Sequence, residues 1–337
     1  MWSTFDLVAK YLKGCTCSGL WEARLAREEF CKWNKNAEVH TYSSAFKETD
    51  IDEIARISDD IVFNSPTQFW KYHERVKKIN LHVKLSLRVN PEVSSSPVDL
   101  YNPCGVYSRL GTTKANFDEK IVPYLEGLNF HALCEQDADA LEKVFYSFEE
   151  KFGEYLYQVK YVNFGGGHHI TKKGYDIQKL IDIIQYVRKK YDVEVYLEPG
   201  EAVGWETGYL EASVLDIVDN GMKIAILDTS AEAHMPDTLA MPYRAEVRGA
   251  GEVGEKPYTY RFAGNTCLAG DVMGDYSFDK PLNVGDRIIF EDQIHYTFVK
   301  NTTFNGIKLP SLAIKRKDGI IEVVKEFCYE DYRDRLS

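Results

Sequence analysis

A short apolar segment followed by a turn and an amphipathic helix recurs through the first 205 residues, and this repeat constrains the fold strongly. Apolar segments lie at 15–17, 39–42, 61–64, 83–89, 128–131, 161–164 and 193–197. The first four begin at residues 15, 39, 61 and 83, so their spacings are 24, 22 and 22 residues, the length of a compact βα unit. Seven such units predict an α/β fold, a (β/α)8 TIM-type barrel from which one unit is missing in this chain.

The missing unit is expected to be the first. Apolar residues at positions 5, 8, 9 and 12 fall at helical spacing, so the chain opens inside a helix pattern. The strand that would precede this helix is therefore expected just upstream of Met1.

Two helix starts carry capping signals. Ser18 is a candidate N-cap for a helix over 19–30. Ser65 is followed by Pro66, a residue suited to the first helical turn, which predicts a helix over 67–79.

After residue 205 the pattern changes to short strands between turn residues. Segments 210–218 and 224–227 flank an Asn-Gly turn and predict a hairpin. Further short strands are expected at 258–262, 287–290, 312–315 and 320–324. The sequence therefore predicts a barrel domain over 1–205 and an all-β domain over 206–337.

Charge and composition exclude several classes of protein. The net charge of the 337 residues is −11 and basic residues form no stripe, so no nucleic-acid partner is expected. No apolar run approaches the roughly 18 residues of a membrane span, and the start carries no secretory signal. Seven scattered cysteines favour reduced thiols in a cytoplasmic protein. Cys15 and Cys17 are followed by no second pair, so no metal site is expected.

Three glycines and a glutamate mark the ends of two predicted strands. Gly165, Gly166 and Gly167 follow segment 161–164, and their small size would let backbone N–H groups close around a phosphate. A tight βα turn would explain the same glycines. Glu198 ends segment 193–197, where a carboxylate could keep a ring nitrogen protonated. A phosphate cradle beside a carboxylate is what pyridoxal 5'-phosphate (PLP) requires.

Other reactive side chains lie at strand ends or in loops. His131 closes segment 128–131 and could stack on a flat ring or serve a structural role. Cys267 and Asp271 lie in a glycine-rich polar loop of the second domain, a kind of loop that is more often functional than structural. Cys267 could donate a proton or be a small buried thiol. Tyr296 could bind phosphate through its phenol or belong to the core.

Together these motifs resemble the alanine-racemase-type (fold III) PLP decarboxylases, and most closely the carboxynorspermidine/carboxyspermidine decarboxylases. The resemblance covers essentially the whole chain. It rests on Tyr101-Asn102-Pro103-Cys104-Gly105, His131-Ala132-Leu133-Cys134-Glu135, the run 165–169, and the segments 228–241, 264–274 and 295–306.

The resemblance implies roles for the cofactor-binding residues. His131 would stack on the PLP ring, and Glu198 would pair with the pyridine nitrogen. The glycines 165–167 and Tyr296 would hold the phosphate. The Schiff-base lysine of the family would lie upstream of Met1, since Lys10 and Lys13 are not at a strand end.

The resemblance also implies a substrate class and a partner. Sister decarboxylases commonly have arginine after the Glu-Pro-Gly turn, whereas this chain has Glu201, a carboxylate that suits an amine of a polyamine. Asp237 could bind a second amine or lie in an ordinary exposed turn. Cys267 and Asp271 would reach across a homodimer interface into the partner's site.

Two alternatives stay open from the sequence. One is a related PLP enzyme, such as a diaminopimelate decarboxylase or an amino-acid racemase. The other is a catalytically inactive homologue that acts as a binding or regulatory subunit.

Overall fold

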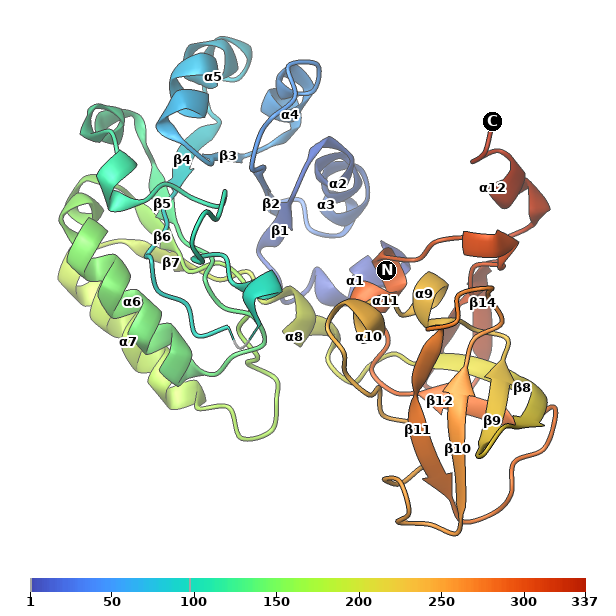
Figure 1. Ribbon diagram of the computed structural model, residues 1–337. Helices are drawn as coiled ribbons and strands as arrows, with labels where there is room; N and C mark the ends of the chain where they lie inside the picture. The colour runs from blue at the N-terminus through green and yellow to red at the C-terminus, as the bar shows by residue number, and fades with distance from the viewer. Residues whose placement is uncertain (1, 97) are drawn as a thin grey trace. The chain divides into compact units, whose positions relative to one another are not determined.

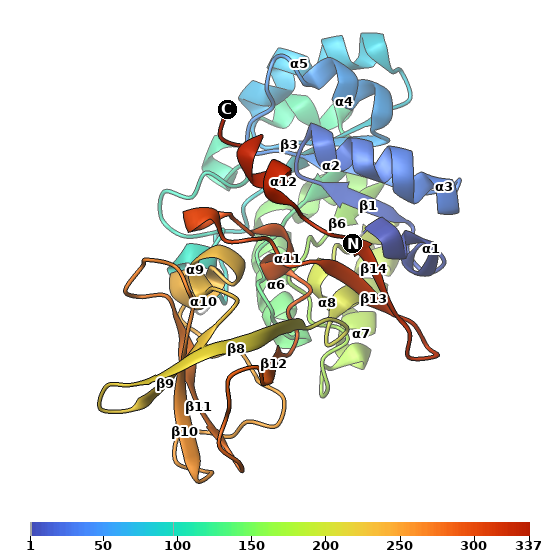
Figure 2. The same cartoon turned by 90° about the vertical axis from the view of Figure 1, so that its right-hand side faces the viewer.

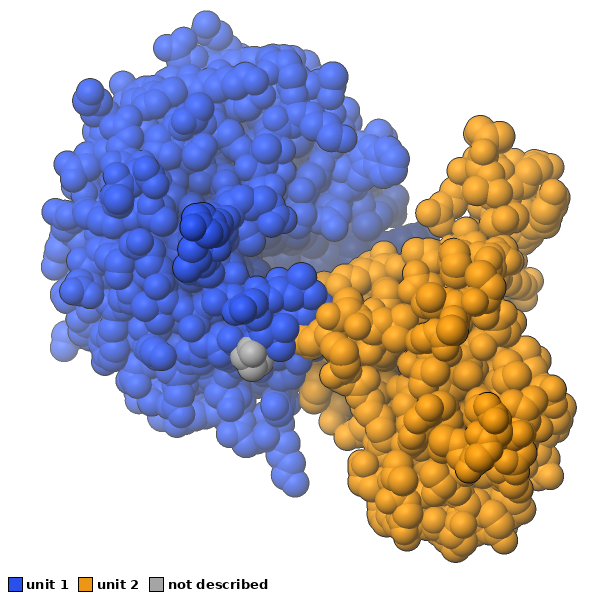
Figure 3. Space-filling view, viewed as in Figure 1, with its two compact units in different colours: residues 1–203 blue, residues 204–337 orange. Residues whose placement is uncertain are grey.

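The chain divides into two compact units, Met1–Val203 and Gly204–Ser337 (Figure 3). The computed structural model describes residues 2–96 and 98–337. The division falls between residues 203 and 204, whereas the sequence pattern predicts a boundary after residue 205. Each unit has its own apolar core.

Unit 1 is built on a parallel sheet whose seven strands follow one another in chain order (Figure 1). Every neighbouring pair is parallel. The strands are β1 (Gly14–Cys17), β2 (Glu38–Tyr42), β3 (Asp60–Phe63), β4 (Lys84–Arg88), β5 (Gly127–Asn129), β6 (Tyr161–Asn163) and β7 (Glu194–Tyr196).

Helices cover the outer face of this sheet (Figure 1). Leu85 of β4 and Val162 of β6 are fully buried in the same apolar cluster as Phe69 and Phe148 from the helices. The helices of unit 1 are α1 (Phe5–Val8), α2 (Leu20–Leu25), α3 (Cys31–Trp33), α4 (Ile51–Ile57), α5 (Pro66–Ile79), α6 (Ala138–Phe152), α7 (Ile177–Tyr191) and α8 (Gly200–Gly204).

The sheet curls, so that side chains from its two ends meet. Lys13, directly before β1, donates a hydrogen bond of 3.2 Å from Nζ to the hydroxyl of Tyr196 on β7. The rings of His40 on β2 and Tyr196 lie 5.3 Å apart. Among the strands described, β1 and β7 each pair with a single neighbour. The TIM-barrel-type α/β fold predicted from the repeat is confirmed.

The connection from β4 to β5 departs from the predicted strand–helix repeat. Its described residues form only the short 3-10 turns η3 (Asp99–Tyr101), η4 (Lys114–Asn116) and η5 (Glu119–Tyr124). Prolines at positions 91, 103 and 123 interrupt this stretch. Proline lacks an N–H group and blocks helix propagation, so no α-helix forms in the described part of this crossover.

One of the two predicted helix caps is present. The Ser65 hydroxyl accepts the N–H of Gln68 at 3.2 Å and caps α5. The Ser18 prediction is wrong, because α2 begins at Leu20 with Gly19 as its N-cap. The Glu22 carboxylate instead accepts the Ser18 N–H at 2.6 Å, and a π-helical turn (Ala26–Phe30) follows α2.

Unit 2 is built on a five-stranded sheet with the order β11-β10-β9-β8-β12 (Figure 2). β9 and β10 are parallel and the other neighbours are antiparallel. The predicted hairpin is confirmed as β8 (Leu210–Asp219) and β9 (Lys223–Leu227). The other strands are β10 (Tyr258–Ala263), β11 (Val272–Phe278), β12 (Arg287–Phe290), and the separate pair β13 (Leu312–Lys315) and β14 (Ile321–Lys325).

Unit 2 also contains elements that the sequence pattern did not predict. β11 begins at Val272, inside a stretch predicted to be loop because of its glycines. Four short helices join the strands, so the unit is mostly sheet and not entirely β. They are α9 (Ala231–His234), α10 (Asp237–Ala240), α11 (Tyr296–Val299) and α12 (Tyr329–Arg333).

Across residues 2–96 and 98–337, no helix is both long enough and apolar enough to cross a membrane. The same residues contain no cluster of three or more His, Cys, Asp or Glu side chains placed to hold a metal ion. All seven cysteines are free thiols.

Candidate active site

Glu198 lies just past the carboxyl end of β7, as predicted for a functional group on a barrel of this type. Its Oε1 accepts a 2.6 Å hydrogen bond from Nδ2 of Asn163, the last residue of β6. Only 15% of the Glu198 side chain is exposed. Burial raises the pKa of Glu198, while the hydrogen bonds from Asn163 and Thr16 and the positive charges of His40 and Arg88 oppose that rise.

His131 lies beside this carboxylate, shortly after β5. Its Nδ1 is 4.0 Å from Oε2 of Glu198, and 39% of its side chain is exposed. Nδ1 accepts the N–H of Gly166 at 3.3 Å, which assigns the ring proton to Nε2. Burial among protein atoms lowers the pKa of His131 below its ordinary value, and the positive charge of Arg88 lowers it further. The imidazole is therefore neutral at pH 7 and partly exposed.

The glycine run after β6 is required by close backbone packing. Gly165 and Gly167 have φ of 71° and 82°, values that favour glycine. A Cβ at Gly166 would lie 2.7 Å from the carbonyl oxygen of Glu198. The N–H of Gly165 donates to Asn163 Oδ1 at 2.8 Å, and that of Gly166 donates to His131. Two of the three donors of the expected phosphate cradle thus bind other groups of unit 1.

Glu201 follows in the first turn of α8, with 20% of its side chain exposed. Its Oε1 lies 3.7 Å from Nε2 of His169, a nearly buried side chain. The structure therefore brings His131, the glycine run, Glu198 and Glu201 together at the carboxyl ends of β5, β6 and β7.

The other predicted site residues belong to unit 2. Both carboxylate oxygens of Asp271 accept hydrogen bonds, and the residue is 2% exposed. Oδ1 accepts the N–H groups of Ala231 at 2.7 Å and Glu232 at 3.3 Å. Oδ2 accepts the hydroxyls of Ser230 at 2.9 Å and Thr266 at 2.6 Å, and the Thr266 N–H at 3.3 Å. Asp271 therefore fastens the loop that carries Cys267 to the start of α9.

Three predicted site residues of unit 2 do not have the purely structural positions that the sequence left open for them. They are Cys267, Tyr296 and Asp237. Cys267 is exposed and is not a buried thiol, and its N–H donates to Asn305 Oδ1 at 2.7 Å. Tyr296 is 51% exposed and not in the core. Asp237 does not lie in an ordinary exposed turn, because it begins α10 and its carboxylate accepts a 2.7 Å hydrogen bond from Lys300 Nζ. That ammonium also lies 4.6 Å from the centre of the Tyr296 ring.

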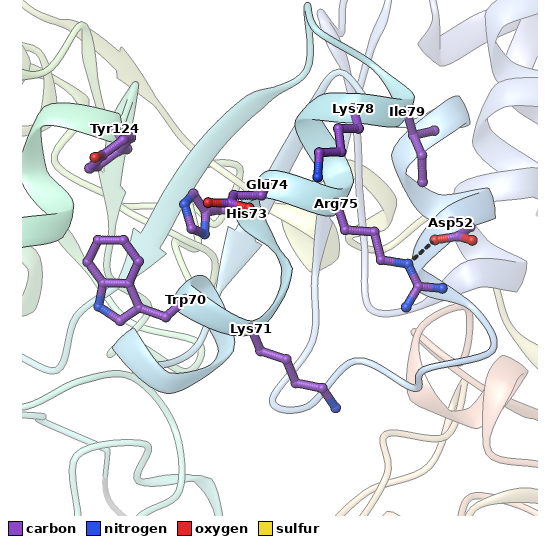
Figure 4. A pocket seen from close by; sticks show the side chains of 9 residues that line it. All are labelled: Asp52, Trp70, Lys71, His73, Glu74, Arg75, Lys78, Ile79 and Tyr124. Carbon is purple, nitrogen blue, oxygen red and sulfur yellow. Dashed lines mark hydrogen bonds and ion pairs between the residues drawn. The ribbon is translucent and has the colours of Figure 1, made fainter.

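A depression of about 720 Å³ lies elsewhere, on the outer face of unit 1. Figure 4 shows Trp70, Lys71 and Arg75 of α5 at its edge, together with Asp52 and Tyr124. It is lined by none of the predicted site residues. Arg75 is paired with Asp52 at 2.6 Å. The residues with the right chemistry lie at the strand ends, so we place the candidate site there.

Asn163 and Thr16 were missed as site residues. Each is a polar side chain within a strand that leads to the site, and both hydrogen-bond Glu198. The sequence does contain a signal for Asn163, because it is a polar residue inside an otherwise apolar segment, two positions before the glycine run.

A curled parallel sheet with a carboxylate and a histidine at its strand ends, joined in the chain to a sheet domain, defines the fold III class of PLP enzymes. The family model of the pyridoxal-dependent decarboxylases, C-terminal sheet domain, matches residues 51–293. The chain belongs to this family, and within it to the carboxynorspermidine/carboxyspermidine decarboxylases.

Three similar proteins support this placement. A carboxynorspermidine/carboxyspermidine decarboxylase from Campylobacter jejuni is 56% identical, over 97% of this chain and 86% of that protein. A carboxyaminopropylagmatine decarboxylase from Synechocystis is 45% identical, over 99% and 85%. The crystal structure of carboxynorspermidine decarboxylase from Campylobacter jejuni, complexed with norspermidine, has a TM-score of 0.90 and 53% identity, over 99% of this chain and 89% of that one.

PLP is the cofactor of this family, and the residues present fit it. Glu198 offers a largely buried carboxylate at the strand ends, and His131 offers a neutral, partly exposed ring beside it. A protonated ring nitrogen beside Glu198 would offset the cost of keeping that carboxylate out of water.

Proposed function

We propose that this chain is a PLP-dependent carboxy-lyase that converts carboxynorspermidine or carboxyspermidine to norspermidine or spermidine. The observation that carries the proposal is Glu198, hydrogen-bonded to Asn163 and beside His131, in a chain 56% identical to a decarboxylase of that name. The domain roles follow: residues 1–205 bind PLP, and residues 206–337 supply further groups to the reaction.

The cofactor-binding roles are divided among four parts of the chain. Bound PLP supplies an electron-accepting ring that takes up the electrons released when CO2 leaves. Glu198 would accept the N–H of that ring, and His131 would cover one ring face with its neutral imidazole. The glycines 165–167 and Tyr296 would hold the phosphate. Gly167 N–H would be the backbone donor, because the N–H groups of Gly165 and Gly166 bind Asn163 and His131.

Two carboxylates would bind the substrate's amines, which are positively charged at pH 7. Glu201 has an exposed edge beside the strand ends. Asp237 accepts a 2.7 Å hydrogen bond from the ammonium group of Lys300, a cation of the same kind as the amines of a polyamine, and this supports the proposed role. A substrate amine would take the place of Lys300 there.

The proton that replaces CO2 on the substrate carbon would come from Sγ of Cys267, an exposed thiol on a loop held in place by Asp271. We further propose that the protein is a homodimer in which Cys267 and Asp271 serve the partner's site. A cytoplasmic location stays a prediction from the sequence.

The test is a comparison of substrates with the PLP-loaded protein. Carboxynorspermidine, carboxyspermidine, carboxyaminopropylagmatine and diaminopimelate are supplied separately, and released CO2 and the amine product are measured. We expect turnover of the first two, and rejection of diaminopimelate because Glu201 repels its second carboxylate. Preferred turnover of diaminopimelate would contradict the proposal, and turnover of none of the four would favour the inactive-homologue alternative.

A further inference from the structure

The Asn163 side chain bridges the glycine run and Glu198. It is 1% exposed, at the carboxyl end of β6. Its amide oxygen accepts the Gly165 N–H at 2.8 Å, and its amide nitrogen donates to Glu198 Oε1 at 2.6 Å. Both ends of one small side chain are therefore bound to parts of the candidate site.

The orientation of this amide is fixed by its partners. A backbone N–H can only donate, so the Asn163 atom that faces Gly165 must be its oxygen. The NH2 group then faces Glu198, and the Glu198 oxygen must accept. This geometry excludes a proton on Oε1, and the hydrogen bond that Asn163 donates stabilises the ionised form of Glu198.

The other charged and titratable groups around Glu198 come from three strands and from the segment after β5. They are Cys17 on β1, His40 on β2, Arg88 on β4 and His131 after β5. His131 Nδ1 lies 4.0 Å from Oε2, whereas Asn163 Nδ2 lies 2.6 Å from Oε1, and the Thr16 side chain is a second hydrogen-bond partner of Glu198. Asn163 thus occupies Oε1, and Oε2 is the oxygen nearer to His131.

We propose that Asn163 is a positioning residue that keeps Glu198 ionised and holds its carboxylate in the orientation that the ring nitrogen of PLP would meet. This rests on the PLP-binding part of the proposed function and does not depend on which substrate is decarboxylated. The glycine run contributes through the Gly165 N–H, which sets the direction of the amide.

The first measurement is the carboxyl titration of Glu198 in the apoprotein, followed by NMR with 13C-carboxyl-labelled glutamate and assigned with Glu198→Gln. Asn163→Ala removes the donor and should raise the pKa of Glu198 above that of the unaltered protein. Asn163→Asp keeps the acceptor for the Gly165 N–H but places a second carboxylate beside Glu198, so it should raise that pKa further. The matched control is Asn90→Ala.

Asn90 is a suitable control because its side-chain amide also accepts one hydrogen bond and donates another, and neither partner is a carboxylate. Its Oδ1 accepts the N–H of Glu92 at 2.7 Å, and its Nδ2 donates to the carbonyl oxygen of Leu110 at 3.3 Å. The control should leave the Glu198 titration unchanged. PLP affinity at pH 7, measured by equilibrium dialysis, should fall about tenfold in Asn163→Ala and stay the same in the control.

A further NMR measurement uses the protein without any substitution. In the unaltered protein, the side-chain amide resonances of Asn163 should shift with pH at the midpoint of the Glu198 titration. An unchanged Glu198 pKa in both Asn163 variants, or Asn163 resonances that ignore that titration, would overturn the proposal. A wild-type protein that binds PLP and releases no CO2 would end the proposed function and leave this inference standing.

Discussion

Cys267 and Asp271 are four residues apart in the chain and have opposite surroundings. The Cys267 side chain is exposed, whereas the carboxylate of Asp271 accepts from Ser230, Thr266 and the start of α9. An exposed thiol can reach a substrate, and a carboxylate held by that many donors chiefly fixes the loop. The two residues should therefore respond differently to substitution.

Cys267→Ala should abolish most turnover and leave the melting temperature unchanged, because the thiol is exposed and proposed to act on substrate. Asp271→Asn should lower stability by about 2 kcal/mol, since its amide NH2 would face donors in a buried position. Steady-state kinetics and thermal melts of both variants check this. Undiminished turnover in Cys267→Ala would remove the thiol from the reaction.

Within the strands of unit 1, polar side chains turn inward and form a buried network. Asp60 of β3 is fully buried and accepts hydrogen bonds from Ser86 of β4, at 2.7 Å, and from the hydroxyl of Tyr161 of β6. Burial raises the pKa of Asp60 above its ordinary value of 3.8. The folded protein therefore binds more protons than the unfolded chain above pH 3.8, and this group makes stability fall as pH rises.

Tyr161→Phe should destabilise the protein by roughly 1–3 kcal/mol at pH 7, since it deletes a donor to the buried Asp60. Without that donor the pKa of Asp60 rises further, so the destabilisation should be smaller at acid pH, where Asp60 is protonated. Chemical denaturation at two pH values checks the sign.

The control is Tyr186→Phe, whose hydroxyl contacts Glu149 at 2.9 Å on the surface of α7. A hydrogen bond of this exposed kind contributes little, so stability should change by a few tenths of a kcal/mol at most. Equal losses for the two variants, or a loss that grows toward acid pH, would rule out the role assigned to Tyr161.

At the level of elements, much of the fold could be predicted from sequence because apolar periodicity reports burial directly. The segment 161–164 and the hairpin after residue 210 are examples. β11 was missed because Gly274 broke its pattern, and its pairing with β10 is a long-range contact that a local pattern does not contain.

The same difference between local sequence patterns and long-range contacts applies to the candidate site. Glu198 and His131 could be predicted from their places at strand ends, which a parallel sheet brings to one edge. The role of Asn163 could not, because it depends on which atoms of β6 and β7 face one another. Sequence spacing places residues at an edge, whereas hydrogen-bond partners follow from the packed side chains.

At the scale of the whole molecule, the residues proposed for one reaction come from both units. Glu198 and His131 belong to unit 1, and Cys267 and Tyr296 belong to unit 2. If each site combines unit 1 of one protomer with Cys267 of the partner, a single chain does not hold a complete site. This makes catalysis dependent on assembly, and that dependence can be measured.

Complementation between two inactive variants tests it. Glu198→Ala and Cys267→Ala should each be inactive alone, and co-expression should form mixed dimers as about half of the population. Each mixed dimer has one site with both native residues and one with neither, so activity should recover to about a quarter of the wild-type value. Glu198→Ala mixed with His131→Ala should recover nothing, because both residues belong to the same unit. If Cys267 acts within its own protomer, both mixtures stay inactive, since every site then contains one substituted residue.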